Sequence, residues 1–231
     1  MESGLLEVLD RRHLGKNAHV MLALLLHVQI LGLLHPQRAL VDGVEAVPGR
    51  RYGGQQFTVQ VGELKRSYAG SMRVEDGGTE LRLINEVELE DYVASVTGSE
   101  LAEGPPAARQ ALAIVARTFA LTAPSLDDTA RSQWYTGLEK ADIASARATE
   151  GQVLKKAGKI VPAFHSQDCG GATRATWQAH ERTPDTHLPG PRGSGHGVGL
   201  CQRGALFLAS KGATTHQILA RYFPGTTISR R

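Results

Sequence analysis

The chain has 231 residues, of which 41% are apolar and 21% charged, with a net charge of +3 and a pI near 9.0. This length can bury one good core, and the composition is that of an ordinary globular protein. No run of Lys and Arg marks a nucleic-acid surface, and two cysteines are too few for a disulfide framework. We therefore expect no nucleic-acid partner, while the mild basic charge suits an anionic polymer.

Residues 1–19 are predicted to be poorly structured or related to export. The apolar stretch Val20–Leu34 follows basic residues, as in a signal peptide, but His27 and Gln29 interrupt it. It is also short for a membrane span, and no convincing small-residue cleavage site follows. Two interpretations stay open, a buried strand of the fold and a degenerate export signal, and the strand is slightly preferred. No clear transmembrane segment is expected.

The next part of the chain has the alternation of apolar and polar residues that is typical of strands. It predicts strands within residues 57–61, 71–75 and 81–84. Turn signals at Gly53-Gly54 and Asp76-Gly77-Gly78 are expected to separate them.

Apolar residues recur at helical spacing from Leu89 onward. Gly98 and Ser99 are expected to end this first helix, with Glu100 just beyond it. Pro105-Pro106 then begins a second helix, because proline is favourable in a first helical turn.

Strand signals return at residues 152–154 and 160–164, and short helices are expected near residues 204–210 and 215–223. Strands and helices that do not strictly alternate indicate an α+β fold. We expect a β-rich N-terminal part, central helices and a mixed C-terminal part.

Two glycine-rich loops each carry a histidine followed closely by a cysteine. The first holds His165 and Cys169 before Gly170-Gly171, and the second holds His196 and Cys201. Glycine at this density lets the backbone pass close to a ligand, and strand exits are common places for site residues. We interpret both stretches as site loops that present the histidines.

The same four side chains, His165, Cys169, His196 and Cys201, are of types that could ligate zinc tetrahedrally in a closed, structural site. A Cys169–His196 nucleophile pair is a weaker alternative. If the two loops meet, the sulfurs lie near one another, as a bridge, as metal ligands or as two ordinary thiols.

Five stretches in order form a wider pattern: Asn85–Val93 leading to Gly98-Ser99-Glu100, Ala116–Ala120, Phe164–Gly171, Gly195–Ala205 and Tyr222–Thr226. Together they resemble the SpoIID/LytB (stage II sporulation protein D) family of peptidoglycan lytic transglycosylases. The resemblance is clearest over residues 79–227 and implies a single domain over residues 20–231.

The resemblance implies cleavage of the MurNAc–GlcNAc glycan backbone to leave 1,6-anhydro-MurNAc ends, with Glu100 as the catalytic acid and a cleft around it. Glycosidases that use water usually need two carboxyl groups. Here the substrate's own C6 hydroxyl attacks, so one Glu can protonate the leaving oxygen and then accept the hydroxyl proton. Partial burial beside Val96 and Leu101 is expected to raise the pKa of Glu100.

The resemblance also implies substrate contacts. Arg117 would hold a lactyl carboxylate or orient Glu100, or else it is a snorkelling surface arginine. His165 and His196 are expected to converge on one cleft with Glu100. The other expected substrate-binding residues are Cys169, Gly170, Gly171, Gly197 and Gln202.

The chain departs from the family pattern in three places, one of which is Leu200-Cys201, where many relatives have Met and Ser. Zinc-binding relatives carry Cys-x3-His-Cys before Gln-x-Tyr, whereas here Asp127, Arg131 and Ser132 occupy the ligand positions. We expect that zinc site to be lost and no cofactor to be required. The segment 178–192 is shorter than usual, which favours the alternative of a non-catalytic module that binds cell wall or modulates an amidase. The expected location is the cell envelope, with glycan strands and other cell-wall hydrolases as partners.

Overall fold

The computed structural model describes residues 21–26, 38–78, 81–128, 132–174 and 194–231. The N-terminal tail, the remainder of the Val20–Leu34 stretch, Arg131 and the shortened segment 178–192 lie outside the described residues. Contacts divide the chain into two compact units, residues 1–95 with 124–141, and residues 96–123 with 142–231. The single domain expected over residues 20–231 stays a prediction.

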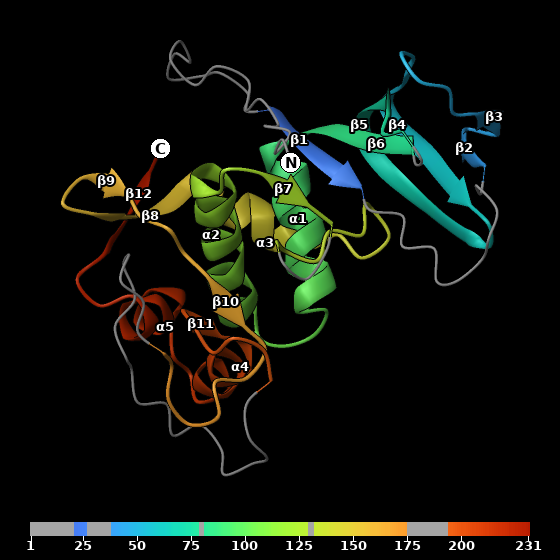
Figure 1. Ribbon diagram of the computed structural model, residues 1–231. Helices are drawn as coiled ribbons and strands as arrows, with labels where there is room; N and C mark the ends of the chain where they lie inside the picture. Colours follow the sequence, from blue (N-terminus) through green and yellow to red (C-terminus); the bar gives the residue numbers. More distant parts are fainter. Residues whose placement is uncertain (1–20, 27–37, 79–80, 129–131, 175–193) are drawn as a thin grey trace. The chain divides into compact units, whose positions relative to one another are not determined.

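The first unit is built on a seven-stranded sheet in the order β3-β2-β4-β5-β6-β1-β7 (Figure 1). Strand β1 pairs antiparallel with β6 and parallel with β7. The strand interpretation of the apolar N-terminal stretch is therefore confirmed for Met21–Leu26. The strands are β1 (Met21–Leu26), β2 (Ala39–Val41), β3 (Val44–Glu45), β4 (Arg51–Val61), β5 (Leu64–Asp76), β6 (Leu81–Glu88) and β7 (Leu126–Asp127).

The three predicted strands are confirmed within β4, β5 and β6, but the turn predicted at Gly53-Gly54 is wrong. Strand β4 continues through it, and its register with β5 shifts between Gly53 and Gln56. Gly53 has a φ of 78°, and an added Cβ would lie 2.6 Å from a ring carbon of Phe57. The glycines therefore serve a bulge inside one long strand.

A buried polar network holds the interior of the first unit. The Tyr135 hydroxyl donates to Asn85 Oδ1 at 2.7 Å, and its ring stacks on Tyr92. The Tyr92 hydroxyl in turn donates to Gln133 Oε1 at 2.9 Å. All four side chains are buried, so the Gln-x-Tyr stretch at 133–135 contributes core hydrogen bonds here.

Helix α1 (Leu89–Glu100) contributes residues 89–95 to the first unit and 96–100 to the second. The predicted helix end at Gly98 is wrong. The helix passes through this glycine, and the Leu101 N–H still donates to the Thr97 carbonyl at 3.0 Å. Glu100 is therefore the last helical residue, rigidly attached to the helix that carries it.

The second unit packs helices against two small sheets. Its helices are α2 (Pro106–Thr122), α3 (Ile143–Ala148), α4 (Gln202–Ser210) and α5 (Thr215–Tyr222), and its strands are β8 (Gln152–Lys156), β9 (Lys159–Ile160), β10 (His165–Ser166), β11 (Leu200–Cys201) and β12 (Thr227–Arg230). The predicted helices are confirmed. The strand expected over 160–164 is shorter, because only Lys159–Ile160 pairs with β8. Mixed strands and helices agree with the predicted α+β class.

Helix α2 is the centre of the second unit, in contact with α3, α4, α5 and β8 (Figure 1). Proline occupies its first turn, as predicted. Its apolar face packs against residues of α4, α5 and β11 in one core cluster, which includes Ala108, Leu112, Val115, Leu200, Ala205, Leu219 and Tyr222. Among the described residues, no helix is both long and apolar enough to cross a bilayer.

Candidate functional site

The candidate site is centred on the carboxyl group of Glu100, within the second unit. Its Oε1 lies 3.3 Å from Nε2 of His165, and its Oε2 accepts a hydrogen bond from Nε2 of Gln202 at 3.0 Å. The side chains of Glu100 and His165 are 17% and 8% exposed, and Gln202 is buried. The structure thus brings together three of the predicted site residues from α1, β10 and α4.

Pairing between two short strands places His165 beside Gln202. Strands β10 and β11 run parallel, with His165 opposite Leu200, and the Leu200 N–H donates to the Phe164 carbonyl at 2.9 Å. Gly199 permits this approach, because an added Cβ would lie 2.1 Å from that carbonyl oxygen. The glycine therefore has a packing role in addition to any approach to a ligand.

Ser166 is a positioning residue that the sequence analysis missed. It is buried, and its Oγ accepts from the Gly197 N–H at 3.0 Å and donates to the Ser194 carbonyl at 3.2 Å. Both bonds tie the glycine-rich loop around His196 to strand β10. The only signal in the sequence is the position of Ser166 directly after His165.

His196 lies in the same neighbourhood as His165. Its ring packs edge-on against Phe164, with the ring centroids 6.2 Å apart, and its Nδ1 accepts the Val198 N–H at 3.0 Å. The residue is exposed as a whole, yet burial of part of the ring lowers the pKa of His196. The nearby His165 and Arg174 also lower this pKa, and a hydrogen bond to the His165 backbone opposes them.

We expect His196 to titrate below the roughly 6.5 of a histidine in a peptide, and to be neutral at pH 7. Because its pKa is lower in the folded state, the unfolded state takes up a proton first as pH falls. The stability contribution of the neutral ring is complete above about pH 6.5 and is lost as pH falls through the folded-state pKa. A pH series of imidazole C–H chemical shifts measures the pKa of His196, and the His196→Gln variant assigns the resonance. Titration at or above 6.5 would contradict this prediction.

Arg117 does not lie where the resemblance implied. Its side chain is fully buried and donates to the carbonyl oxygens of Ala146 at 3.2 Å and Gln152 at 3.1 Å, with a longer contact to the Thr149 hydroxyl. A side chain enclosed in this way cannot contact a glycan, and it is not a snorkelling surface arginine. Arg117 instead joins α2 to the C-terminal end of α3 and the start of β8.

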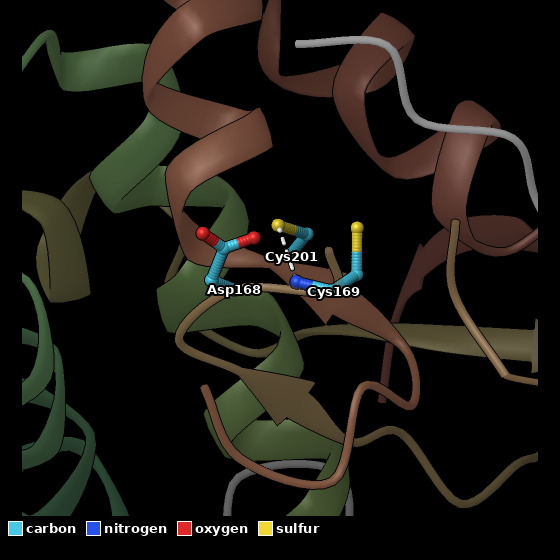
Figure 2. Close-up of side chains that lie close together, drawn as sticks. All are labelled: Asp168, Cys169 and Cys201. Atoms are coloured by element: carbon cyan, nitrogen blue, oxygen red, sulfur yellow. Dashed lines mark hydrogen bonds between the residues drawn. The ribbon is translucent and has the colours of Figure 1, made fainter. Parts of the chain in front are cut away.

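The two cysteines meet, as predicted. The sulfurs of Cys169 and Cys201 and a carboxyl oxygen of Asp168 all lie within 4.8 Å of one another (Figure 2). Both cysteines are thiols, and Cys201 Sγ accepts the Cys169 N–H at 3.4 Å. Asp168 also accepts from Gly170 N–H at 2.9 Å and pairs with Arg203 at 2.8 Å.

The cluster differs from the zinc-ligand set expected from the sequence. Within the part of the chain that the structure describes, the one group of potential metal ligands is Asp168, Cys169 and Cys201, and it includes neither His165 nor His196. At the family's zinc position Ser132 stands where a cysteine is needed, and the loss of that zinc site stays a prediction.

The remaining predicted substrate-binding residues have distinct surroundings. Gly170 and Gly171 are exposed and have positive φ, in the turn that the Asp168 carboxylate closes. Gly197 is buried, and its N–H and carbonyl are taken by Ser166 and Arg174. Of these three glycines, Gly170 and Gly171 are therefore the exposed ones.

The geometry around Glu100 suits proton transfer. When Glu100 is ionised, both of its oxygens can accept N–H groups, from His165 on one side and Gln202 on the other. When it is protonated, the imidazole nitrogen can accept its proton. The carboxyl group is thus held in a fixed orientation in either protonation state, as a general acid/base requires.

Comparisons with known proteins find a family match over the part of the chain that carries Glu100. The model of the SpoIID family, described as stage II sporulation protein, matches residues 77–156. Over that segment the chain is similar to the SpoIID family. The segment contains Glu100 and Arg117, whereas His165, Cys169, His196 and Gln202 follow it in the chain.

Two curated relatives match parts of the chain. Stage II sporulation protein D of Bacillus subtilis is 47% identical over 49 residues, which is 21% of this chain and 14% of that protein. An uncharacterized protein of Brachyspira hyodysenteriae is 31% identical over 119 residues, which is 46% of this chain and 32% of that protein. The chain thus covers less than a third of either relative.

Proposed function

We propose that this protein acts on bacterial cell wall, as a lytic transglycosylase that cleaves the glycan strands of peptidoglycan. The observation that carries the proposal is the position of Glu100, which lies inside the SpoIID-family segment and is held between His165 and Gln202. A cell-wall role also places its action outside the cytoplasm.

In the proposed reaction Glu100 first gives its proton to the glycosidic oxygen that leaves. The C6 hydroxyl of the N-acetylmuramic residue then attacks the anomeric carbon, and Glu100 takes the proton of that hydroxyl. In this proposal His165 and Gln202 orient the carboxyl group so that a single residue can act twice. No second carboxylate is needed, because the nucleophile belongs to the substrate.

The exposed backbone of Gly170-Gly171 and the ring of His196 are proposed to contact the glycan. Neutral imidazole is both a donor and an acceptor, so it suits sugar hydroxyl and acetamido groups. With Nδ1 accepting from Val198, the neutral ring carries its proton on Nε2, where a sugar oxygen would replace the His165 backbone as the acceptor.

The test is incubation of the purified chain with peptidoglycan, followed by mass analysis of the released fragments. We expect 1,6-anhydro-MurNAc ends, on intact strands or on strands whose stem peptides have been removed. Reducing MurNAc ends would contradict the transglycosylase step. Binding to peptidoglycan without any new ends, on both substrates, would favour a non-catalytic wall-binding module over the enzyme.

A further inference from the structure

The pair of thiols near the candidate site is not used by the proposed reaction. Cys169 follows strand β10, and Cys201 ends strand β11, so the pairing of these strands brings the two sulfurs within 4.8 Å. Figure 2 shows the Cys201 sulfur between the Asp168 carboxylate and the Cys169 side chain. A disulfide requires this separation to close to about 2.05 Å.

The sulfur of Cys201 is held in place by two backbone N–H groups. It caps the N-terminus of α4, where it accepts the Gly204 N–H at 3.3 Å, and it also accepts the Cys169 N–H at 3.4 Å. These two N–H groups fix the Cys201 sulfur at the junction of β11 and α4, and the thiolate of either cysteine is the reactive form in disulfide exchange.

The carboxylate in the cluster is already engaged. Asp168 pairs with the Arg203 guanidinium at 2.8 Å and closes a turn with the Gly170 N–H at 2.9 Å. A metal would have to compete with this cation for the carboxylate, whereas a bond between the sulfurs leaves the ion pair in place. The arrangement therefore favours sulfur–sulfur chemistry over metal binding.

The two thiols differ in their exposure to solvent. Cys201 is fully buried, whereas Cys169 is partly exposed. A disulfide compound from solution can therefore reach Cys169 first. The buried Cys201 can then attack the mixed disulfide formed on Cys169.

We propose that Cys169 and Cys201 are a modification site, where a low-molecular-weight disulfide such as oxidised glutathione converts them to a reversible intramolecular disulfide. The Cys169 thiolate attacks one sulfur of the oxidant and releases one glutathione thiolate. The Cys201 thiolate then attacks the Cys169 sulfur of this mixed disulfide and releases the second. The two protein thiols lose two electrons and two protons, and one glutathione disulfide becomes two thiols.

Oxidation has a structural consequence at α4. A bond to Cys169 draws the Cys201 sulfur away from the Gly204 N–H, so the first turn of the helix loses its cap. Gln202, which donates to Glu100, is the first residue of that turn. The disulfide therefore loosens the positioning of Gln202 as well as joining the two loops.

The experiment equilibrates the full chain in glutathione buffers of increasing oxidised fraction, with quenching, alkylation and peptide mass mapping. We expect a mass lower by two hydrogens, one cross-linked peptide pair that contains Cys169 and Cys201, and full reversal by a dithiol. Faster hydrogen exchange of the Gly204 amide is expected in the oxidised form. None of these measurements depends on glycan cleavage, so they stand apart from the proposed enzymatic function.

Two variants give matched controls. Cys169→Ser cannot form the cross-link, and Cys201→Ser retains a capping oxygen and should fold while it accumulates glutathione on Cys169. Stable glutathione adducts on both cysteines of the parent protein, without a cross-link, would overturn the proposal. So would thiols that alkylate only after a chelator removes a bound metal.

Discussion

Replacing Glu100 by Gln is expected to lower the rate of glycan cleavage by roughly 100-fold or more, in line with the loss of a general acid/base. The amide keeps the size of the carboxyl group. Its oxygen can still accept from Gln202, and its NH₂ can donate to the imidazole of His165 once that nitrogen is unprotonated. The variant should therefore fold and still bind peptidoglycan, so that only the chemical step is removed.

Release of 1,6-anhydro-MurNAc ends over time, normalised to bound protein, measures this loss. Glu103→Gln is the matched control, because Glu103 is exposed three residues along the chain. It removes the same charge and should leave cleavage unchanged. Cleavage by Glu100→Gln at the parental rate would remove Glu100 from the proposed mechanism.

The sheet and the helices could be predicted where the sequence has a strong period. Alternation within residues 57–61, 71–75 and 81–84 lies in β4, β5 and β6, and the apolar face after Pro106 lies on α2. Glycine was the misleading signal. Gly53 lies in a bulge and Gly98 inside α1, because the tertiary contacts around them outweigh the weak helix and strand propensity of glycine.

The site was only partly predictable. The sequence marked Glu100, His165 and Gln202 through a family resemblance, but no local pattern places them together. Their meeting depends on the parallel pairing of β10 with β11, strands that are too short to have a readable period. The ion pair of Asp168 with Arg203 had no sequence signal, because it joins residues whose proximity is set by that same pairing.

Arg117 shows most clearly what the sequence pattern alone could not predict. A single arginine in an apolar helix can bind a ligand, extend to the surface or satisfy buried carbonyls, and the sequence pattern is the same in each case. Only the positions of Ala146 and Gln152 distinguish the third possibility.

Replacing Arg117 by Ala is expected to lower the free energy of unfolding by about 3–5 kcal/mol. The substitution leaves a cavity between α2, α3 and β8, and it removes the guanidinium donors to the carbonyl oxygens of Ala146 and Gln152. Arg117→Lys keeps the charge but loses the planar fork that reaches several acceptors, so it should lose part of this stability. Glycan binding by the folded fraction should be unchanged in both variants, because the guanidinium does not reach the surface.

Chemical denaturation followed by far-UV circular dichroism measures the change. Arg147→Ala is the matched control, because Arg147 is exposed on α3, the helix whose Ala146 carbonyl Arg117 binds, and its loss should cost less than about 1 kcal/mol. If Arg117→Ala unfolds at the parental denaturant concentration but binds glycan more weakly, Arg117 is a ligand-binding residue and its assignment to the core is wrong. If the variant is strongly destabilised with unchanged binding per folded molecule, the guanidinium belongs to the interior. The arginine of α2 then serves to hold α3 and β8 against this helix.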